Sequence, residues 1–589
     1  MPILDPHSFA DAEQPQTRHL TLRLTVDFTR RVLAGEAVLR LDRDSGGPLD
    51  LDTRSLTIRS VRCGGREVAF TLHEETPILG QKLSLNVPAG ESEVTIAYET
   101  SPDSSALQWL SPEQTAGKRQ PFLFSQCQAI HARALAPLQD TPRRRITYDA
   151  ELTIPAALTA VMSAGPAAPV GAHTETKVLA FHMPQPIAPY LLALAVGDLE
   201  ARDLSPRSRV YAEPATVDAA ASEFSEVEAI LEAAEKLFGP YDWDRFDMLV
   251  LPPSFPYGGM ENPRITFLTP TLLAGDRSLV AVVAHELAHS WTGNLITNAT
   301  AEHFWLNEGF TVWAERRIVE AVWGQDAVLL AWANGAKALE GSLSRYGKDS
   351  PLTKLKTDLV GVDPDDAISQ IPYEKGARLL VLMERFVGRE RWDRFVREYM
   401  DRFRFSSITS YQFLAFLEEK LPGTPFAVRA EEWLYTAGLP DNAPAFPSAA
   451  LDAITSLASG FTAGERPAAE VVARWSPGEM VLYLQNLPRV LSSEDCAWLD
   501  ANLALTGRGN HEILVEWLTV AAGSDYEPAF PRIREVLLGV GRVKYLRPLY
   551  SALGRHPRTQ ALARDCYAAA RPGYHGLSRR VVEQVIAGY

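Results

Sequence analysis

The sequence predicts a multidomain α+β protein with a β-rich first domain, a middle domain that mixes helices and strands, and an all-helical last domain. Three observations predict this: alternating apolar residues in the first part, helical spacing from about residue 222, and helical spacing alone after a proline-rich stretch. A chain of 589 residues is also too long for one hydrophobic core, so three or four domains are expected. The predicted domains are 1–200, 201–440 and 451–589, with the proline-rich linker at 441–450.

The first domain is predicted from alternation. Leu20, Leu22, Leu24, Val26 and Phe28 fall at every second position, which places them on one face of a half-buried strand. Glycine pairs at 46–47 and 64–65 separate such runs and are typical of turns. A β-rich domain to about residue 200 follows from this pattern.

The middle and last domains are predicted from helical spacing. The stretch 222–239, SEFSEVEAILEAAEKLFG, has apolar residues at helical spacing and ends in a glycine stop. Mixed signals continue to about Leu439, and LPDNAPAFPS then supplies three prolines, which indicates a linker. Beyond it, IREVLLGVGR and LSRRVVEQVIAG have helical periodicity, so the last domain is expected to be all helix.

The charge balance excludes some classes of partner. A formal net charge of -15 repels duplex nucleic acid, and no long Lys/Arg run offsets it. The short cluster Arg143–Arg145 is interpreted as a solvated loop. An acidic surface also resists anionic membranes, so we expect no nucleic-acid partner and no membrane partner.

The sequence indicates a cytoplasmic protein. Its start, MPILDPHSFADAEQP, lacks a basic segment followed by an apolar one, so no secretory signal is predicted. No apolar run approaches the roughly 20 residues that cross a bilayer. The cysteines at positions 63, 127, 496 and 566 are widely separated and are expected to be free, mostly buried thiols.

The segment VAVVAHELAHSWTGN carries the chemistry. His285 and His289 are one helical turn apart, about 40° around the axis, so both imidazoles can reach one metal ion. Glu286 lies beside them, where a carboxylate can accept a proton from water without being a ligand. The alternative for this motif alone is an ordinary amphipathic helix with two surface histidines.

A catalytic zinc site needs a third protein ligand and an open position. Eighteen residues separate His289 from Glu308, which opens a second helical pattern in HFWLNEGFTVWAERR. Glu315 lies about 10.5 Å further along that helix, too far to bind the same ion, and is interpreted as a solvated glutamate rather than a partner of a ligand. His303 is interpreted as structural.

Together these motifs resemble the gluzincin aminopeptidases. HELAH is followed by NEGF and preceded by GGMEN, and the segments LPPSFPYGGMENP, HFWLNEG, QIPYEKG, WLYTAGLP, GRVKYLRPLY and QCQAIHARALAPLQDTP resemble the leukotriene A4 hydrolase and aminopeptidase B branch. The matches run in order from about residue 126 to residue 550. The resemblance implies a saddle-like β-sheet domain, a thermolysin-like α/β zinc catalytic domain and a C-terminal helical-repeat domain.

The resemblance also implies catalytic roles. His285, His289 and Glu308 would hold one Zn²⁺ per chain, which would bring a water toward a pKa of about 7. Glu286 would be the general base, and Tyr373 would donate a hydrogen bond to the tetrahedral oxyanion. Without the resemblance, a core aromatic is the better interpretation of Tyr373.

Substrate-binding positions are implied in the same way. Glu261 matches the glutamate that binds the α-amine, with Gln128 as its partner, and Tyr257 and Met260 would line the pocket for the first side chain. Arg542 and Lys544 would meet the carboxylate of a short peptide, although alone they suggest solvated basic residues. The predicted set is Gln126, Gln128, Tyr257, Gly258, Gly259, Met260, Glu261, Asp365, Arg542 and Lys544. Asp365, lining the inner pocket, would favour a basic first residue.

The sequence therefore predicts a zinc metalloaminopeptidase, a cytoplasmic monomer, that acts on di- and tripeptides with a free N-terminus. The alternative is a bifunctional enzyme that also hydrolyses a leukotriene A4-type lipid epoxide. Ile368 and Ala301 stand where the leukotriene enzymes carry tyrosine and tryptophan, which argues against that activity. A zinc endopeptidase and an inactive peptide-binding scaffold are the other candidates; the first has no use for Glu261, and the second does not need Glu286.

Overall fold

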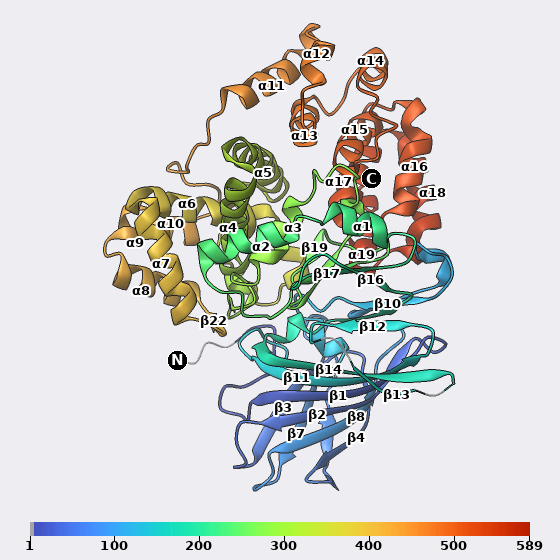
Figure 1. Ribbon diagram of the computed structural model, residues 1–589, viewed down its shortest axis with the longest axis vertical. Coiled ribbons are helices and arrows are strands. Elements are labelled where there is room, and N and C mark those ends of the chain that lie inside the picture. The colour runs from blue at the N-terminus through green and yellow to red at the C-terminus, as the bar shows by residue number, and fades with distance from the viewer. Residues whose placement is uncertain (1–4, 166–167, 173) are drawn as a thin grey trace.

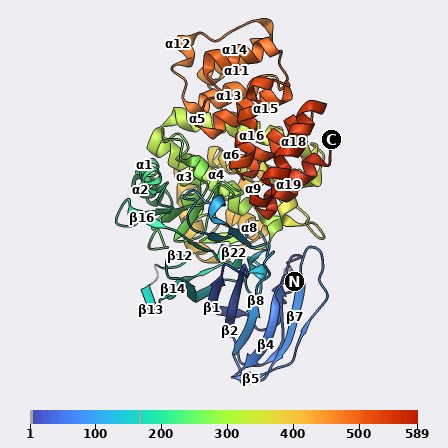
Figure 2. The ribbon, with the colours of Figure 1, turned by 90° about the vertical axis from the view of Figure 1, so that its right-hand side faces the viewer.

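The computed structural model describes residues 5–165, 168–172 and 174–589, and it has the three-part architecture predicted from the sequence (Figure 1). The β-rich N-terminal part, in blue, lies at one end of the molecule, and the C-terminal helices, in orange and red, lie at the other. The mixed part, in green and yellow, lies between them, and the side view gives the same arrangement (Figure 2).

The N-terminal part consists of three sheets. An eight-stranded sheet has the order β13-β14-β11-β1-β2-β8-β4-β5, and β1 pairs parallel to β11 and antiparallel to β2. A three-stranded sheet, β3-β7-β6, and a four-stranded sheet, β12-β15-β10-β9, complete it. The strands are β1 (Thr17–Asp27), β2 (Val32–Leu41), β3 (Gly47–Thr53), β4 (Thr57–Cys63), β5 (Arg66–Glu67), β6 (Phe70–Leu72), β7 (Gln81–Val87), β8 (Glu93–Glu99), β9 (Leu107–Leu110), β10 (Phe122–Ser125), β11 (Ile146–Pro155), β12 (Thr159–Met162), β13 (Ala168–Ala172), β14 (Thr176–Ile187) and β15 (Leu194–Gly197).

The alternation predicted for the first strand is confirmed. Leu20, Leu22, Leu24 and Val26 are buried along β1, while Phe28 lies just beyond the strand and packs against the same core. Both glycine pairs lie at strand breaks, between β2 and β3 and between β4 and β5.

The middle part is built on a five-stranded sheet of order β16-β17-β18-β20-β19. Its strands are β16 (Glu200–Asp203), β17 (Arg209–Ala212), β18 (Asp247–Val250), β19 (Gly259–Met260) and β20 (Ile265–Leu268), and a separate pair is β21 (Ile296–Asn298) with β22 (Ser406–Ile408). The helices are α1 (Val217–Glu223), α2 (Val227–Phe238), α3 (Ala281–Ala288), α4 (Trp305–Trp323), α5 (Gln325–Tyr346), α6 (Gly376–Val387), α7 (Arg389–Arg402), α8 (Ser410–Lys420), α9 (Thr424–Ala427) and α10 (Ala430–Tyr435). The edge strand β19 carries two of the predicted substrate-binding residues.

Strand β18 joins two hydrophobic cores. Leu249 and Leu251 pack into the core of the N-terminal part, whereas Met248 and Val250 pack against the helices of the middle part. Because successive side chains of a strand point to opposite faces, one strand contributes to both cores. The sheet that leads to β19 is therefore buried on both faces.

The C-terminal part is all-helical, as predicted. Its helices are α11 (Ala449–Ser459), α12 (Ala469–Val472), α13 (Pro477–Asn486), α14 (Ser493–Leu503), α15 (His511–Gly523), α16 (Phe530–Gly539), α17 (Val543–Leu553), α18 (Pro557–Ala570) and α19 (Gly576–Ile586). They enclose a third core, against which Leu329, Leu330 and Ala333 of α5 also pack. Residues 440–448 have no regular structure, but Phe446 stacks on Trp332 of α5 with ring centroids 4.1 Å apart. The predicted linker is thus bound to the middle part.

Two sequence interpretations need correction. The helix predicted over 222–239 is two helices, because the chain turns between Glu223 and Val227; the predicted stop at Gly239 is confirmed. The cluster Arg143–Arg145 is not simply solvated. Arg145 donates hydrogen bonds to the carbonyls of Pro186, Asn294, Leu295 and Ser406 and so ties the first sheet to the middle part.

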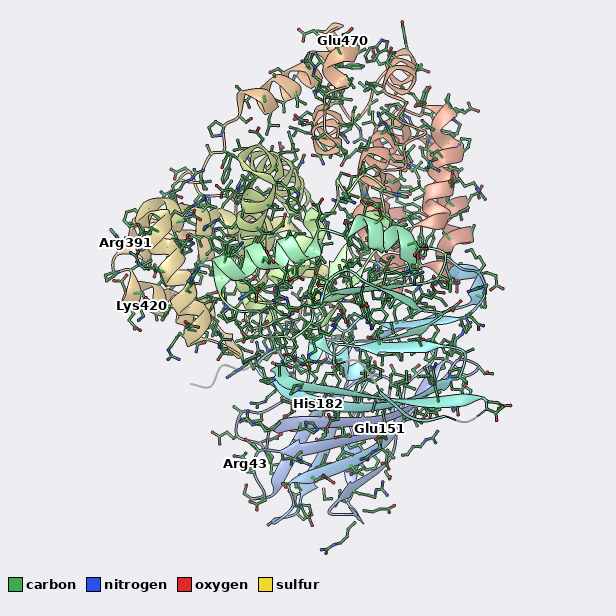
Figure 3. The ribbon with its side chains drawn as sticks, in the orientation of Figure 1. Arg43, Glu151, His182, Arg391, Lys420 and Glu470 are labelled. Carbon is green, nitrogen blue, oxygen red and sulfur yellow. The ribbon has the colours of Figure 1, made fainter. Side chains whose placement is uncertain are left out.

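Surface and core composition agree with the sequence. Charged side chains such as Arg43, Arg391 and Glu470 lie at the periphery (Figure 3). The four cysteines are free and buried, as predicted. Within the described ranges, no helix is both long enough and apolar enough to cross a membrane.

Candidate active site

Two helices bring the predicted metal ligands together. His285 lies in α3 and His289 directly after it, while Glu308 lies in the first turn of α4. Oε2 of Glu308 is 3.4 Å from Nε2 of His285 and 3.5 Å from Nε2 of His289. One ligand atom from each of the three residues lies within 4.8 Å of the others, so the far-apart carboxylate converges on the histidine pair.

This donor set fits Zn²⁺. Oε2 of Glu308 is buried without a hydrogen-bond partner, although it points at two imidazole nitrogens, and such an orphaned acceptor suits a cation. Burial opposes protonation of His285, but Glu308 and Glu315 outweigh it and raise its pKa, so the centre favours positive charge. Burial lowers the pKa of His289 to about 4, which keeps this imidazole in the neutral form that binds metal.

The second ring nitrogen of each histidine is also fixed. Nδ1 of His289 lies 3.0 Å from the carbonyl oxygen of Thr292, and Nδ1 of His285 lies 3.0 Å from Oε2 of Glu315. Nδ1–H donation to these oxygens leaves both Nε2 lone pairs facing Glu308. The interpretation of Glu315 as a solvated residue is therefore wrong, because two glutamates of one helix contact opposite nitrogens of the same ring. His303, which bonds Ser410, is structural as predicted.

Glu286 lies against the GGMEN segment. A β-carbon built on Gly259 would lie 2.2 Å from its Oε1, so only glycine leaves room for this carboxylate beside β19. Burial raises the pKa of Glu286 to about 8. Glu261, Glu286 and His289 also offer oxygen and nitrogen atoms within 4.8 Å of one another, so the predicted base adjoins both the metal ligands and the predicted amine site.

Tyr373 lies in a short π-helix, Ile371–Lys375, which leads into α6. Its ring stacks on that of His285, with centroids 6.2 Å apart and planes 14° from parallel. Burial raises the pKa of the phenol, which therefore stays protonated and able to donate. Single turns of π-helix are frequent at functional sites.

Two glycines set the spacing between this π-helix and α4. A β-carbon on Gly309, the residue after Glu308, would lie 2.8 Å from the Cα of Gly376 and 2.8 Å from the carbonyl oxygen of Pro372. On Gly376 it would lie 2.9 Å from the Cα of Gly309. The backbones that carry Glu308 and Tyr373 are therefore in direct contact.

The predicted amine-binding residues meet across two domains. Nε2 of Gln128 donates to Oε1 of Glu261 at 3.1 Å, and Nε2 of Gln126 lies 3.3 Å from Sδ of Met260. Glu261 is buried, and this burial raises its pKa. A buried carboxylate next to an amide oxygen is a suitable partner for a cationic α-amine.

Arg542 and Lys544 meet at a carboxylate that the sequence did not indicate. Arg542 immediately precedes α17, Lys544 lies in its first turn, and both contact Glu512 at the start of α15. Nζ of Lys544 is 2.7 Å from Oε2 of Glu512. Arg542 is buried and its guanidinium lies against Gly258, so it is not the solvated residue that its sequence context alone suggests.

Asp365 lies where three parts of the chain meet. Its Oδ2 is 2.9 Å from Nε2 of His131 and 2.7 Å from Nη2 of Arg580 in α19. Burial would raise the pKa of Asp365, but these two partners outweigh it and lower the pKa to about 2. Since its charge is already compensated, we expect Asp365 to contribute little to selection of a basic first residue, unlike the expectation from the sequence.

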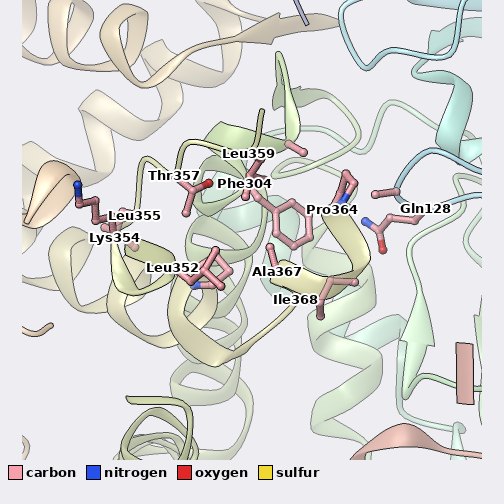
Figure 4. A pocket seen from close by; sticks show the side chains of 13 residues that line it. Gln128, Phe304, Leu352, Lys354, Leu355, Thr357, Leu359, Pro364, Ala367 and Ile368 are labelled. Atoms are coloured by element: carbon pink, nitrogen blue, oxygen red, sulfur yellow. The ribbon is translucent and has the colours of Figure 1, made fainter. Parts of the chain in front are cut away.

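A pocket continues from Gln128 into the middle part (Figure 4). Phe304 projects into it, and Lys354 and Thr357 are among its few polar residues. Ala301 and Ile368, the two departures noted in the sequence, both line it. The remaining lining is Ala129, Leu352, Leu355, Leu359, Pro364, Ala367 and Pro372.

Four residues of this region were not assigned a role from the sequence: Glu315, Glu512, His131 and Arg580. Glu315 had a signal, since it lies seven positions after Glu308 on one helix. The other three had none, because each is brought to its partner only by packing between domains.

Models of known families match three successive parts of the chain. Residues 16–191 match the peptidase M1 N-terminal domain, residues 223–431 match the peptidase family M1 domain, and residues 475–586 match the C-terminal domain of leukotriene A4 hydrolase.

Individual relatives cover nearly the whole chain. Leucine aminopeptidase 2 of Yarrowia lipolytica is 38% identical over 614 residues, covering 99% of this chain and 93% of that protein. Leukotriene A-4 hydrolase of Xenopus laevis is 38% identical over 601 residues, covering 98% of each. The structure of yeast LTA4 hydrolase in complex with bestatin superimposes with a TM-score of 0.91 at 32% identity, covering 99% of this chain and 97% of that one.

Proposed function

The chain belongs to peptidase family M1 and is a zinc metallopeptidase, and from this we propose that it removes single residues from the N-terminus of short peptides. The observation that carries the proposal is the position of Glu261. Its carboxylate adjoins Glu286 and the metal ligand His289, so an α-amine bound there would hold the first peptide bond at the centre.

We propose the following roles in hydrolysis. Zinc held by His285, His289 and Glu308 would polarise the scissile carbonyl and acidify water. Glu286 accepts the proton of the attacking water and passes it to the leaving amine. Tyr373, whose phenol stays protonated, donates a hydrogen bond to the oxyanion.

The chain end would be recognised by Glu261 and Gln128 together. Gln128 holds one carboxylate oxygen of Glu261, and the charged α-amine would bind the pair. An acetylated N-terminus carries neither the charge nor the donors, and it would leave a buried carboxylate without its partner. Such a loss costs several-fold more than a missing surface contact.

The test compares one tripeptide in free and N-acetylated forms, with and without a zinc chelator. We expect free amino acids from the free form only, loss of activity with the chelator, and recovery on adding Zn²⁺. Efficient cleavage of the acetylated peptide would replace this proposal with an endopeptidase.

The apolar pocket supports a second candidate function, hydrolysis of a lipid epoxide. It opens beside Gln128 and its lining suits a fatty-acid chain (Figure 4). We rank this below peptide hydrolysis because Ala301 and Ile368 change the lining. Incubation with an epoxide fatty acid, followed by analysis for the diol, separates the two.

We propose a cytoplasmic monomer as the working form. The acidic surface and the free, buried cysteines support a reducing compartment. Cell fractionation and the mass in solution are the corresponding measurements.

A further inference from the structure

Glu512 organises a cluster of polar groups at the far side of the GGMEN segment. Its Oε1 accepts a hydrogen bond from Tyr545 Oη at 2.8 Å and lies 3.3 Å from Nη1 of Arg542. Its Oε2 lies 2.7 Å from Nζ of Lys544. Burial would raise the pKa of Glu512, but Lys544 and Arg542 outweigh it and lower the pKa to about 2. Glu512 is therefore a permanent anion between two cations.

The guanidinium of Arg542 is held by one nitrogen. Nη1 donates to Tyr545 Oη at 2.7 Å and to Oγ1 of Thr271 at 3.3 Å, in addition to Glu512. Among the residues that the structure describes, Nε and Nη2 have no hydrogen-bond partner, although Arg542 is only 5% exposed. A buried donor edge of this kind suits a planar, bidentate acceptor.

This free edge faces the substrate-binding segment. A β-carbon built on Gly258 would lie 2.7 Å from Nη2 and 3.7 Å from Nε of Arg542. The neighbouring Gly259 contacts Glu286, and adjacent Cα atoms are about 3.8 Å apart. The open side of the arginine therefore lies a short distance along the chain from the predicted base, as the C-terminus of a bound di- or tripeptide would.

We infer that Glu512 is a positioning residue for recognition of the peptide's C-terminal carboxylate: by holding Nη1, it presents the Nε–Nη2 edge of Arg542 to the cleft. This rests on the proposed function, in which Arg542 binds that carboxylate. Glu512 does not occupy the binding edge itself, because its contact is with Nη1. Tyr545 holds the same nitrogen and supports the same orientation.

Lys544 has a different part in this arrangement. Its side chain is 60% exposed and its ammonium is paired with Glu512. It thus offsets the charge of Glu512, so that the cluster of two cations and one anion keeps one net positive charge for the substrate. Arg542, and not the arginine–lysine pair as a unit, makes the direct contact.

The experiment uses one tripeptide as its free acid and as its C-terminal amide, with steady-state kinetics on the purified full chain. Glu512→Ala should raise KM for the free acid about tenfold, with little change in kcat, and should affect the amide much less. Glu512→Gln, which keeps an acceptor for Nη1, should recover part of the loss. Turnover of the amide shows in each case that the variant is folded.

Arg542→Ala supplies the decisive comparison. In its background, Glu512→Ala should add almost nothing, because a positioning residue has no effect once the positioned group is gone. Glu516→Ala is the matched control: Glu516 lies one turn along α15 and pairs with Arg489 away from the cleft, so its removal should leave both KM values unchanged.

Two results would overturn the inference. A lower KM for the free acid in Glu512→Ala would make Glu512 a competitor of the substrate, and additive effects in the double variant would separate it from Arg542. The proposed function fails differently: Arg542→Ala would then weaken acid and amide equally, whatever Glu512 does.

Discussion

Individual side chains at the centre act in pairs. His285 is the clearest case, because Glu308 faces its Nε2 and Glu315 binds its Nδ1. A carboxylate on Nδ1 fixes the tautomer and orientation of a ligating imidazole and makes it more basic. The strength of the zinc site should therefore depend on a residue that never touches the metal.

Replacing Glu315 tests this dependence. Glu315→Ala should weaken zinc binding about 10–100-fold, because His285 loses the partner that orients it. Competition with a chelator of known affinity measures the change. Glu320→Ala, on the same helix but paired with Arg389 at the surface, should retain the wild-type affinity. Equal affinities in all three proteins would show that Glu315 has no part in the site.

Glu286 allows the opposite separation. Glu286→Gln should keep zinc at one ion per chain, since no ligand is changed, and should lose about 10²–10⁴-fold in kcat because the base is gone. Metal analysis and kinetics on the same sample give both values. A variant that turns over normally would assign proton transfer to another group.

At the scale of helices, the contact between Gly309 and Gly376 fixes the geometry of the centre. It joins the backbone of α4, just after Glu308, to the start of α6, just after Tyr373. Close packing of this kind does not deform gradually, so an added methyl group must separate the two elements.

Gly309→Ala should therefore lower kcat more than it raises KM. A displacement of about 1 Å at such a centre costs about 10²-fold, and the added strain costs about 1–3 kcal/mol of stability. Gly341→Ala in α5, where a new methyl group meets nothing within 4 Å, is the control and should be nearly neutral. If both variants behave alike in kcat, the close contact has no catalytic consequence.

At the scale of the whole molecule, Asp365 links all three parts, through His131 on one side and Arg580 on the other. Asp363 also contacts Arg580. The pKa of Asp365 is lowered from 3.8 to about 2, so its ionised form stabilises the folded chain. This contribution is fully present above about pH 4 and is lost as the pH falls toward 2.

Asp365→Asn should lower the stability of the folded chain by about 1–3 kcal/mol at pH 7, because His131 and Arg580 lose a charged partner. Thermal unfolding measures it. The gap between wild type and variant should narrow as the pH is lowered from 4 toward 2. A gap that is constant over this range would mean that the charge of Asp365 does not stabilise the fold.

The sequence predicts local features and misses contacts between domains. Alternation over β1 and helical spacing over α19 depend on neighbouring residues, so the architecture could be predicted. The metal ligands could be found because their spacing is set by one helical turn and by resemblance to a known family. Glu512, in contrast, contacts Arg542 30 positions away only after α15 and α17 pack together. The break between α1 and α2 is likewise invisible to periodicity, because the apolar pattern continues through it.

The stacking of Phe446 on Trp332 limits where the chain can be shortened. A two-domain fragment cut at residue 440 would lose Phe446 and uncover an indole that also carries the guanidiniums of Arg316 and Arg378. Cutting after residue 448 would preserve this cover. Even then, Leu329, Leu330 and Ala333 of α5 would be bared where the third core had packed, so polar replacements there would be needed to keep the fragment from aggregating.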